Sequence, residues 1–202
     1  GNAVLFSIAR AFRDAGSRVL YFAGYRDGAS LFKREQIEAA TDQVIWATDG
    51  GPEIAPGRLG DAHFRGNIVQ AMLAYARGDL GPRRVPLQGV DRILAIGSDG
   101  MMRAVAEARH GPLAPYLRPD HVALGSINSP MQCMLKEVCA QCLQRHVDPV
   151  TGEETLVYSC FDQDPALDRV DFGHLRQRLR QSSVHEKLSD LWYRDHVERA
   201  AE

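Results

Sequence analysis

Residues 91–102, DRILAIGSDGMM, indicate the fold class of this chain of 202 residues. The continuous apolar run Asp91–Ile96 is typical of a strand buried on both faces. Gly97-Ser98-Asp99-Gly100 then forms a tight turn before a helix over Met101–Arg109. Strand, turn and helix in this order make up the repeating unit of folds in which helices cover both faces of a parallel sheet. The stretch therefore predicts an α/β domain.

The same unit occurs twice more upstream. Ser17–Gly24 (SRVLYFAG) predicts a strand, and after a loop a helix follows over Leu31–Thr41. Gln43–Thr48 (QVIWAT) predicts the next buried strand, which ends at the turn signal Asp49-Gly50-Gly51-Pro52. A loop rich in Gly and Pro leads from there to a helix over Gly66–Arg77. The repetition predicts a Rossmann-like, mostly parallel sheet.

The chain opens on a helix instead of a strand. Apolar residues recur at helical spacing in GNAVLFSIARAF, from Val4 to Phe12, and Gly16 is a plausible stop. In α/β folds a helix that starts directly after a glycine usually follows a strand and a turn. We therefore expect a first strand upstream of Gly1, and we interpret the chain as a fragment.

The composition excludes several classes of protein. Hydrophobic residues make up 45% and charged residues 25%, and the net charge of −2 indicates neither a nucleic-acid nor a membrane surface. No apolar run approaches the roughly 20 residues of a membrane span. Arg10, Arg13 and Asp14 interrupt the first apolar face, so no secretory signal is present. All four cysteines lie within residues 133–160, which favours metal ligands in a reducing compartment over a disulfide framework. We predict a cytoplasmic protein.

Three glycine-containing loops predict a nucleotide site. In open α/β sheets, ligands bind in the crevice at the carboxyl ends of the strands. Glycines there allow backbone N–H groups to approach a phosphate, and the helix N-termini that follow favour anions. The alternative is that the glycines only form tight turns. The candidate cofactor-binding residues are Gly1, Asn2, Gly24, Tyr25, Arg26, Thr48, Asp49, Gly50, Gly97, Ser98, Asp99 and Met101.

The cysteines predict a metal site. Residues 129–160 read SPMQCMLKEVCAQCLQRHVDPVTGEETLVYSC, with the spacing C-x5-C-x2-C-x17-C for Cys133, Cys139, Cys142 and Cys160. The runs 143–147 and 154–159 around Asp148-Pro149-Val150-Thr151-Gly152 predict a β-hairpin that carries the last ligand. Four thiolates can hold an iron–sulfur cluster or a structural zinc. Three close ligands and a distant fourth favour a 2Fe-2S cluster, but the spacing alone leaves zinc open.

No catalytic residue is predicted. The seven histidines are scattered beside charged or turn residues, and no metalloprotease or nucleophile-elbow motif is present. We expect all of them at the surface: His63, His110, His121, His146, His174, His185 and His196.

Taken together, these motifs resemble the ferredoxin–NADP reductase superfamily. The order is strand–GYR (24–26), strand–TDGG (48–51), strand–IGSDGMMRAV (96–105) and a cysteine cluster. It is most similar to the electron-transfer subunit of dihydroorotate dehydrogenase and to the small subunits of sulfide dehydrogenase and NADH-dependent ferredoxin:NADP oxidoreductase. The resemblance extends from Gly1 to about Phe172. Its most specific parts are CAQC (139–142) and YSCFD (158–162).

The resemblance implies an electron-transfer role. In that family a β-barrel binds FAD, the α/β domain binds NAD(P)H, and a C-terminal loop holds a 2Fe-2S cluster. Hydride passes from nicotinamide to flavin, and single electrons then pass through the cluster to a partner. By position, Gly1-Asn2 would end the family's Gly-rich loop, Gly97–Met101 would match its C-G-P-x-x-M segment, and the four cysteines would be the ligands. Ile96 and Ser98 replace the Cys and Pro of that segment, and the first cysteine interval is one residue longer than usual.

The predicted organisation has three parts. Residues 1–118 form the NAD(P)-binding α/β domain without its first strand, residues 119–172 the 2Fe-2S module, and residues 173–202 a helical tail. The implied protein is an NAD(P)H-dependent oxidoreductase component, inactive alone in this fragment. Its partners would be an upstream FAD-binding barrel and a larger oxidoreductase domain or subunit.

Two alternatives remain open. One is a zinc-stabilised interaction module on a nucleotide-binding α/β domain, and the other is a Rossmann-like scaffold with inert cysteines. Nor does the sequence choose between NADH and NADPH. Arg26 and Arg34 follow the second strand, where a guanidinium could meet a 2′-phosphate, but both could equally be solvated.

Overall fold

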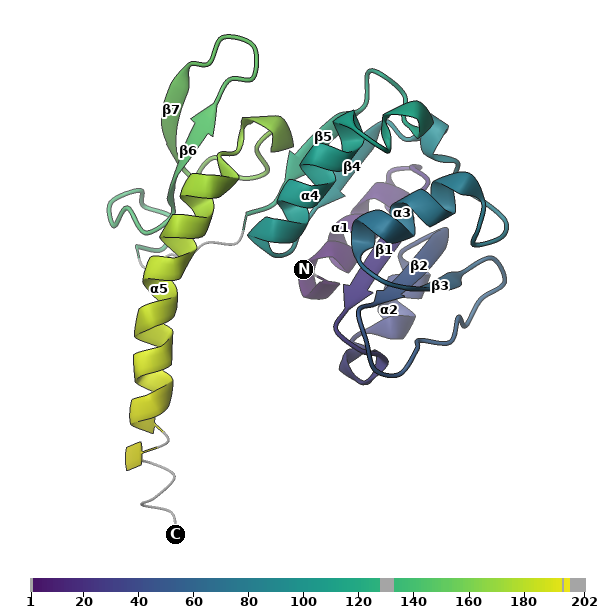
Figure 1. The fold of residues 1–202 in the computed structure, drawn as a ribbon, viewed down its shortest axis with the longest axis horizontal. Coiled ribbons are helices and arrows are strands. Elements are labelled where there is room, and N and C mark those ends of the chain that lie inside the picture. The colour runs from purple at the N-terminus through teal and green to yellow at the C-terminus, as the bar shows by residue number, and fades with distance from the viewer. Residues whose placement is uncertain (1, 128–132, 194, 197–202) are drawn as a thin grey trace. The chain divides into compact units, whose positions relative to one another are not determined.

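The computed structural model describes residues 2–127, 133–193 and 195–196. The chain forms two compact units, Gly1–Gly125 and Ser126–Glu202 (Figure 1). Within the described residues, no helix combines the length and the apolar character that crossing a membrane requires.

The first unit is an α/β fold with parallel strands, as the sequence predicts. β1, β2 and β3 form one sheet in the order β1-β2-β3, and β4 pairs with β5 in a second; every pair is parallel. The strands are β1 (Leu20–Tyr25), β2 (Gln43–Thr48), β3 (Ala62–Arg65), β4 (Arg92–Ala95) and β5 (Val122–Gly125). The helices are α1 (Asn2–Asp14), α2 (Arg34–Ala39), α3 (Ile68–Arg77) and α4 (Asp99–His110), with short 3-10 turns at Gly28–Ser30, Leu87–Gly89 and Ala114–Tyr116.

Helices cover both faces of β1. Tyr21 and Ala23 pack with Ala9 of α1 in one buried cluster. Phe22, which points to the opposite face, meets Tyr75 of α3 edge to face, with ring centroids 5.7 Å apart. β2 is buried at all six positions, which is why its four central residues, Val44–Ala47, are continuously apolar instead of alternating.

The sequence did not predict β3. Its four residues, AHFR, contain two polar side chains and show no apolar run, so the Gly- and Pro-rich segment before it was expected to lead directly into a helix. The strand forms because it pairs with β2, in a register that sets Ile45 opposite Ala62. α3 then begins at the capping box of Asn67 and Gln70 and ends at Gly78, which has φ +90°.

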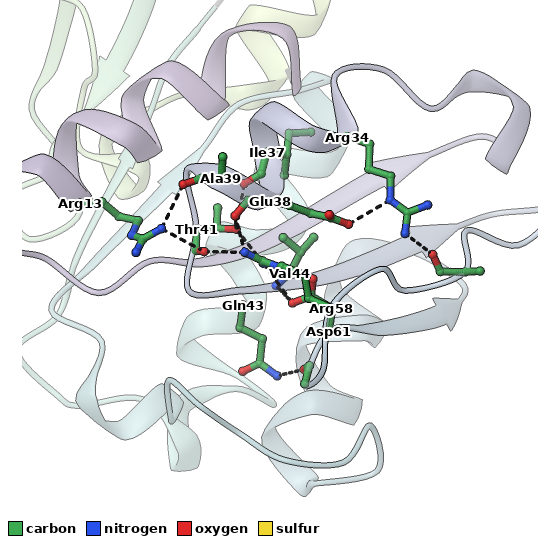
Figure 2. A network of polar contacts seen from close by, with 12 residues as sticks. Arg13, Arg34, Ile37, Glu38, Ala39, Thr41, Gln43, Val44, Arg58 and Asp61 are labelled. Atoms are coloured by element: carbon green, nitrogen blue, oxygen red, sulfur yellow. Dashed lines mark hydrogen bonds and ion pairs between the residues drawn. The ribbon is translucent and has the colours of Figure 1, made fainter.

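A polar network holds the loop before β3 (Figure 2). Arg58 donates to the Thr41 carbonyl at 2.9 Å and to Asp61 Oδ2 at 2.8 Å, and it also bonds the Glu38 carbonyl. Asp61 Oδ1 in turn accepts the Val44 N–H at 2.9 Å. The network therefore joins the end of α2 and the start of β2 to the loop.

The second unit consists of a hairpin and a long helix. The predicted hairpin is present: β6 (Leu143–Val147) and β7 (Glu154–Tyr158) pair antiparallel. Asp148 Oδ1 shapes its turn by accepting the N–H groups of Val150 at 2.9 Å and Thr151 at 3.0 Å. A 3-10 turn, Leu167–Arg169, leads to α5 (Phe172–Tyr193).

The compact units differ from the predicted boundaries. The predicted boundary after residue 118 comes before β5, whereas the division comes after it, because β5 pairs with β4. The predicted tail from residue 173 belongs to the second unit. Asp171 ties it there by capping the His174 N–H at 2.9 Å and pairing with Arg145 of β6 at 2.5 Å.

Candidate functional site

Three segments meet at the carboxyl end of β1. Asn2, at the start of α1, donates through Nδ2 to the Gly24 carbonyl at 3.0 Å and accepts the Tyr21 hydroxyl at 3.3 Å. The Asp49 N–H donates to the Tyr25 carbonyl at 3.2 Å. The start of α1 and the loops after β1 and β2 are therefore held together.

A cavity of about 1200 Å³ opens beside these segments. Gly1 lies outside the described residues, and Thr48, Gly50 and Asp99 are not among the lining residues. The cavity brings together candidates from three predicted loops and the start of α1: Asn2, Gly24, Tyr25, Arg26, Asp49, Gly97, Ser98 and Met101.

Two of the candidate cofactor-binding residues, Thr48 and Gly50, make hydrogen bonds within the fold. Thr48 is fully buried, and its Oγ1 lies 2.9 Å from His63 Nε2. The Gly50 N–H donates to the Arg26 carbonyl at 3.0 Å, so this N–H is already used. Burial lowers the pKa of His63, which favours the neutral ring beside Thr48. Sequence reasoning missed this contact because no local pattern signals it.

The turn before α4 lets a ligand approach its backbone closely. Ser98 Oγ caps the helix by accepting the Met101 N–H at 3.2 Å. A Cβ added to Gly97 would lie 2.4 Å from Met101 Cε, so a side chain there would displace the end of the Met101 side chain. The N-terminus of this helix of 12 residues opens into the cavity through Gly97 and Ser98, where its dipole favours an anion.

Arg26 and Arg34, the two arginines considered as partners of a 2′-phosphate, differ in their contacts. Arg34 donates to Glu38 Oε1 at 2.9 Å and to the Ala55 carbonyl at 2.6 Å (Figure 2), so its guanidinium is held within the fold. Arg26 lines the cavity, and its side chain is exposed. Of the two, Arg26 is the one available to a ligand in that cavity.

The four cysteines of the second unit form two pairs of free thiols. Cys133 and Cys139 are half-buried and hydrogen-bonded to each other. Cys142 and Cys160 are only 2% exposed and also share a hydrogen bond. The pairs are near neighbours, since the charge of Cys133 acts on Cys160.

The loop between the cysteines has an unusual backbone. Positive φ values of 52° to 66° occur at four residues with side chains, namely Met134, Leu135, Glu137 and Ala140. Such residues are uncommon, and a cluster of them turns successive N–H groups toward one side as an anion-binding concavity. In this loop the N–H groups of Val138 and Cys139 act on the Cys133 sulfur, and that of Glu137 acts on the Cys160 sulfur.

The N–H groups change the acidity of the thiols. Hydrogen bonds from the backbone of Val138 and then Cys139 lower the pKa of Cys133 to about 6, against the effect of desolvation. For Cys160, burial and the neighbouring Cys142 raise the pKa, while the Glu137 N–H acts to lower it. Cys133 therefore favours the thiolate, which is the form that binds metals.

Helix α5 contacts the cysteine loop through Arg178. Arg178 donates through Nη2 to the Ala140 carbonyl at 2.5 Å and to the Gln141 carbonyl at 3.4 Å. These carbonyls lie between Cys139 and Cys142. Because one guanidinium binds both, it fixes the path of the chain between the two thiol pairs.

The four thiols do not converge on one point. Within the described part of the chain, no three His, Cys, Asp or Glu side chains form a group that could hold one metal ion. A structural zinc needs four ligands around one point, with sulfur at about 2.3 Å. A 2Fe-2S cluster instead spreads four cysteines over two irons.

Two histidines correct the expectation of surface positions. His121 is 9% and His146 4% exposed. His121 is buried because Arg109 Nε donates to its Nε2 at 2.9 Å, and its Nδ1 lies 2.6 Å from the Arg118 carbonyl. His146 occupies a buried position of β6 in alternation with half-buried neighbours, a pattern that depends on α5 packing against that strand.

Comparison with solved structures shows a protein of similar fold. A solved structure described as an NADH-dependent reduced ferredoxin-NADP oxidoreductase, studied for flavin-based electron bifurcation, superimposes with a TM-score of 0.68. The match covers 96% of this chain and 58% of that one at 21% identity, so it shows a shared fold.

Sequence comparison gives a shorter match. An uncharacterised protein of Rickettsia prowazekii (strain Madrid E) is 40% identical over 65 residues, which is 32% of this chain and 9% of that protein. No family model matches. The chain therefore spans less than two thirds of both proteins.

Proposed function

We propose that this chain is the electron-transfer module of an NAD(P)H-dependent iron–sulfur flavoprotein oxidoreductase of the cytoplasm. NAD(P)H binds in the cavity of the first unit, and Cys133, Cys139, Cys142 and Cys160 hold a 2Fe-2S cluster. FAD is bound mainly by a domain outside this chain, and a larger oxidoreductase domain or subunit is the electron partner. The observation that carries the proposal is the arrangement of the thiols in two pairs under a loop of backbone N–H donors.

Each part of the chain has a defined task in this proposal. The bound cluster supplies one-electron transfer, which no amino-acid side chain of the site provides. The loop residues stabilise negative charge on sulfur, and Arg178 fixes the loop. Nicotinamide and flavin carry the hydride chemistry, so no acid or base residue is needed in the chain.

The surroundings of the thiols suit contact with a partner protein. Met134 and Leu135 follow Cys133, Val138 precedes Cys139 and Phe161 follows Cys160, and all four apolar side chains are exposed. Exposed apolar groups gathered at one site mark interaction surfaces. A partner that covers them would approach the half-buried pair Cys133 and Cys139.

The fold shared with the ferredoxin-NADP oxidoreductase supports the same kind of activity. That protein is described as NADH-dependent and as a subject of flavin-based electron bifurcation. Its longer chain leaves room for a domain that this chain does not contain, which is consistent with a separate flavin site.

Anaerobic reconstitution with iron and sulfide tests the cluster. We expect a coloured protein with two irons and two sulfides per chain, as in a 2Fe-2S centre, and a paramagnetic signal after one-electron reduction. Cys139→Ser should lose the colour, whereas Ser126→Ala, a change outside the four ligands, should keep it. A colourless protein that retains stoichiometric zinc would overturn the cluster in favour of the zinc-stabilised module.

Calorimetry with NADH and NADPH on the full-length protein tests the nucleotide cavity. Gly97→Val should weaken binding by at least about tenfold, since its side chain would meet Met101 in the tight turn. Gly100→Ala is the matched control, because a Cβ there would meet nothing within 4 Å. Equal affinities of the two variants would remove the cavity from the proposal.

A further inference from the structure

The second unit buries polar side-chain atoms that have no hydrogen-bond partner. Among the residues that the structure describes there are five such atoms, and all but Trp46 Nε1 lie in this unit: Gln144 Nε2 and Oε1, His146 Nε2 and Arg178 Nε. Gln144 is only 1% and His146 4% exposed. A polar atom that is buried without a partner lowers stability, so its presence needs a physical explanation.

Gln144 and His146 lie on the same face of β6 as Cys142. Side chains alternate between the two faces of a strand, and in β6 these two residues are buried while their neighbours are half-buried. Cys142, directly before β6, continues the alternation, since it is buried as well. Its carbonyl accepts the Ser159 N–H at 3.1 Å, which extends the register of β6 and β7 by one residue. The side chains of Cys142 and Gln144 therefore point in the same direction.

The Gln144 amide is within reach of two thiols. Residues two apart along a strand are separated by about 6.6 Å, at roughly 3.3 Å per residue, and a glutamine side chain is long enough to bridge such a gap. Cys142 shares a hydrogen bond with Cys160, so both sulfur atoms lie at this end of β6. Gln163 provides a contrast, because its Nε2 already donates to the Cys160 carbonyl at 3.1 Å.

We propose that Gln144 donates a hydrogen bond to sulfur of the metal centre, and that His146 positions the Gln144 amide. The inference rests on the proposed function, because it requires the four thiols to hold a 2Fe-2S cluster. Gln144 Nε2 would donate to sulfur beside Cys142, and His146 Nε2 would donate to Gln144 Oε1. This arrangement gives a partner to all three atoms and turns the NH₂ group, instead of the carbonyl, toward negatively charged sulfur.

A donor at this position would tune the cluster. Hydrogen bonds to the sulfur atoms are among the factors that set the reduction potential of an iron–sulfur centre. One-electron reduction adds a negative charge, and a donor stabilises the reduced form more than the oxidised form, especially in a buried site of low dielectric constant. Gln144 would therefore raise the potential. The backbone N–H groups of Val138 and Cys139 act on Cys133, whereas Gln144 would act from β6.

The stability of the metal-free protein separates this role from a purely structural one. There the Gln144 amide makes no hydrogen bond to the described part of the protein, so an apolar side chain of similar length removes a desolvation cost. Proteins retain such costs at functional sites. In urea unfolding, metal-free Gln144→Met should be at least as stable as the parent chain. A clear loss of stability would show that the amide supports the fold and would overturn the inference.

Redox titration of the reconstituted protein tests the donor directly. Gln144→Met should decrease the equilibrium constant for one-electron reduction about tenfold, which is a fall of about 59 mV in the midpoint potential. Gln177→Met, at an exposed position of α5, should keep the parent potential. An unchanged potential in fully loaded Gln144→Met would overturn the inference alone. Failure of the parent chain to take up iron and sulfide would instead overturn the proposed function, and the inference with it.

A double-mutant cycle tests His146 as a positioning residue. His146→Phe keeps a ring but cannot donate, so it should lower the potential by less than Gln144→Met does. In the Gln144→Met background it should change nothing, because it acts only through the Gln144 amide. Additive shifts would contradict that role. Because His146→Phe retains Gln144, it also tests the inference if Gln144→Met takes up no cluster, and an unchanged potential would then overturn it.

Discussion

At the residue scale, the cysteine loop depends on groups that are not cysteines. The N–H groups of Val138 and Cys139 reach the Cys133 sulfur, and the guanidinium of Arg178 binds the carbonyls of Ala140 and Gln141. Backbone N–H groups of the loop thus act on sulfur, while the Arg178 guanidinium binds carbonyl groups of the same loop. The four thiols are the reactive groups, but the backbone around them sets their positions.

Arg178→Gln should weaken the cluster site without removing a ligand. Hydrogen bonds to a charged donor contribute roughly 1.5–3 kcal/mol, so the loop between Cys139 and Cys142 should open more often. We expect the visible absorbance of the reconstituted protein to decay several-fold faster in air. Gln177→Ala, an exposed change on the same turn of α5, should decay at the wild-type rate. Equal rates for both variants would show that Arg178 does not hold the loop.

His146 should make the second unit sensitive to mild acid. Burial lowers the pKa of His146, with Asp162 acting to raise it and Arg169 to lower it. The unfolded chain therefore binds a proton at a higher pH, near 6.5, than the folded chain. Stability is fully present above that pH and declines as the pH falls toward the lower pKa of the folded state.

Urea unfolding between pH 5 and 8 measures this effect. His146→Gln should flatten the decline below pH 6.5, because no titrating group remains at that buried position. His196→Gln changes an exposed ring and should keep the wild-type slope. A ring proton of His146 that titrates above pH 6.5 by NMR would contradict the prediction.

At the scale of elements, polar contacts decide where strands start. The four central residues of β2, Val44–Ala47, are all apolar, so they do not specify its register. Asp61 supplies that information by accepting the Val44 N–H, and Arg58 links the same carboxylate to the end of α2 (Figure 2). A loop without regular structure thereby fixes two elements.

Asp61→Asn should destabilise the first unit markedly. The Asp61 side chain is 2% exposed, and the change removes the charge that balances Arg58. Breaking one partner of a buried ion pair costs about 3–5 kcal/mol, and the partial exposure of Arg58 should reduce this to roughly 2–3 kcal/mol. Chemical denaturation followed by Trp46 fluorescence measures the change. Glu107→Gln, in the exposed pair with Arg103, should leave stability unchanged.

At the scale of the whole chain, the candidate nucleotide cavity and the four thiols lie in different units. The first contains the candidate nucleotide cavity within residues 2–122, and the second contains all four thiols. Each unit has its own core, one around β1 and β2 and one where α5 packs on β6. Removing the nucleotide from the first unit, or the metal from the second, should therefore leave the other unit folded.

Removing the cluster should affect only the second unit. Metal binding contributes to folding where the ligands lie on an otherwise short, loop-rich segment. We expect chelation of iron from the reconstituted protein to speed amide exchange in β6, β7 and the cysteine loop by about tenfold or more. Exchange in β2 should stay the same. Faster exchange in β2 would show that the units do not fold independently.

Much of the fold could be predicted because its pattern is local. The runs at Gln43–Thr48 and Arg92–Ala95 are apolar enough to be identified as strands, although only the first is buried throughout, and the hairpin at Asp148–Gly152 follows from its turn residues. β3 could not be found this way, since only pairing with β2 stabilises its polar sequence. The buried positions of His121 and His146 likewise depend on neighbours distant in sequence.

The sequence by itself determined which chemistry is present: four clustered thiols, glycine turns after buried strands, and helices between them. Only the tertiary structure decided how these groups are used. It joined the thiols into two pairs, engaged Thr48 and Arg34 in internal contacts, and left a cavity between β1 and β4. The physical reason is that periodicity reports which side chains avoid water, whereas the pairing of polar groups depends on which distant segments meet.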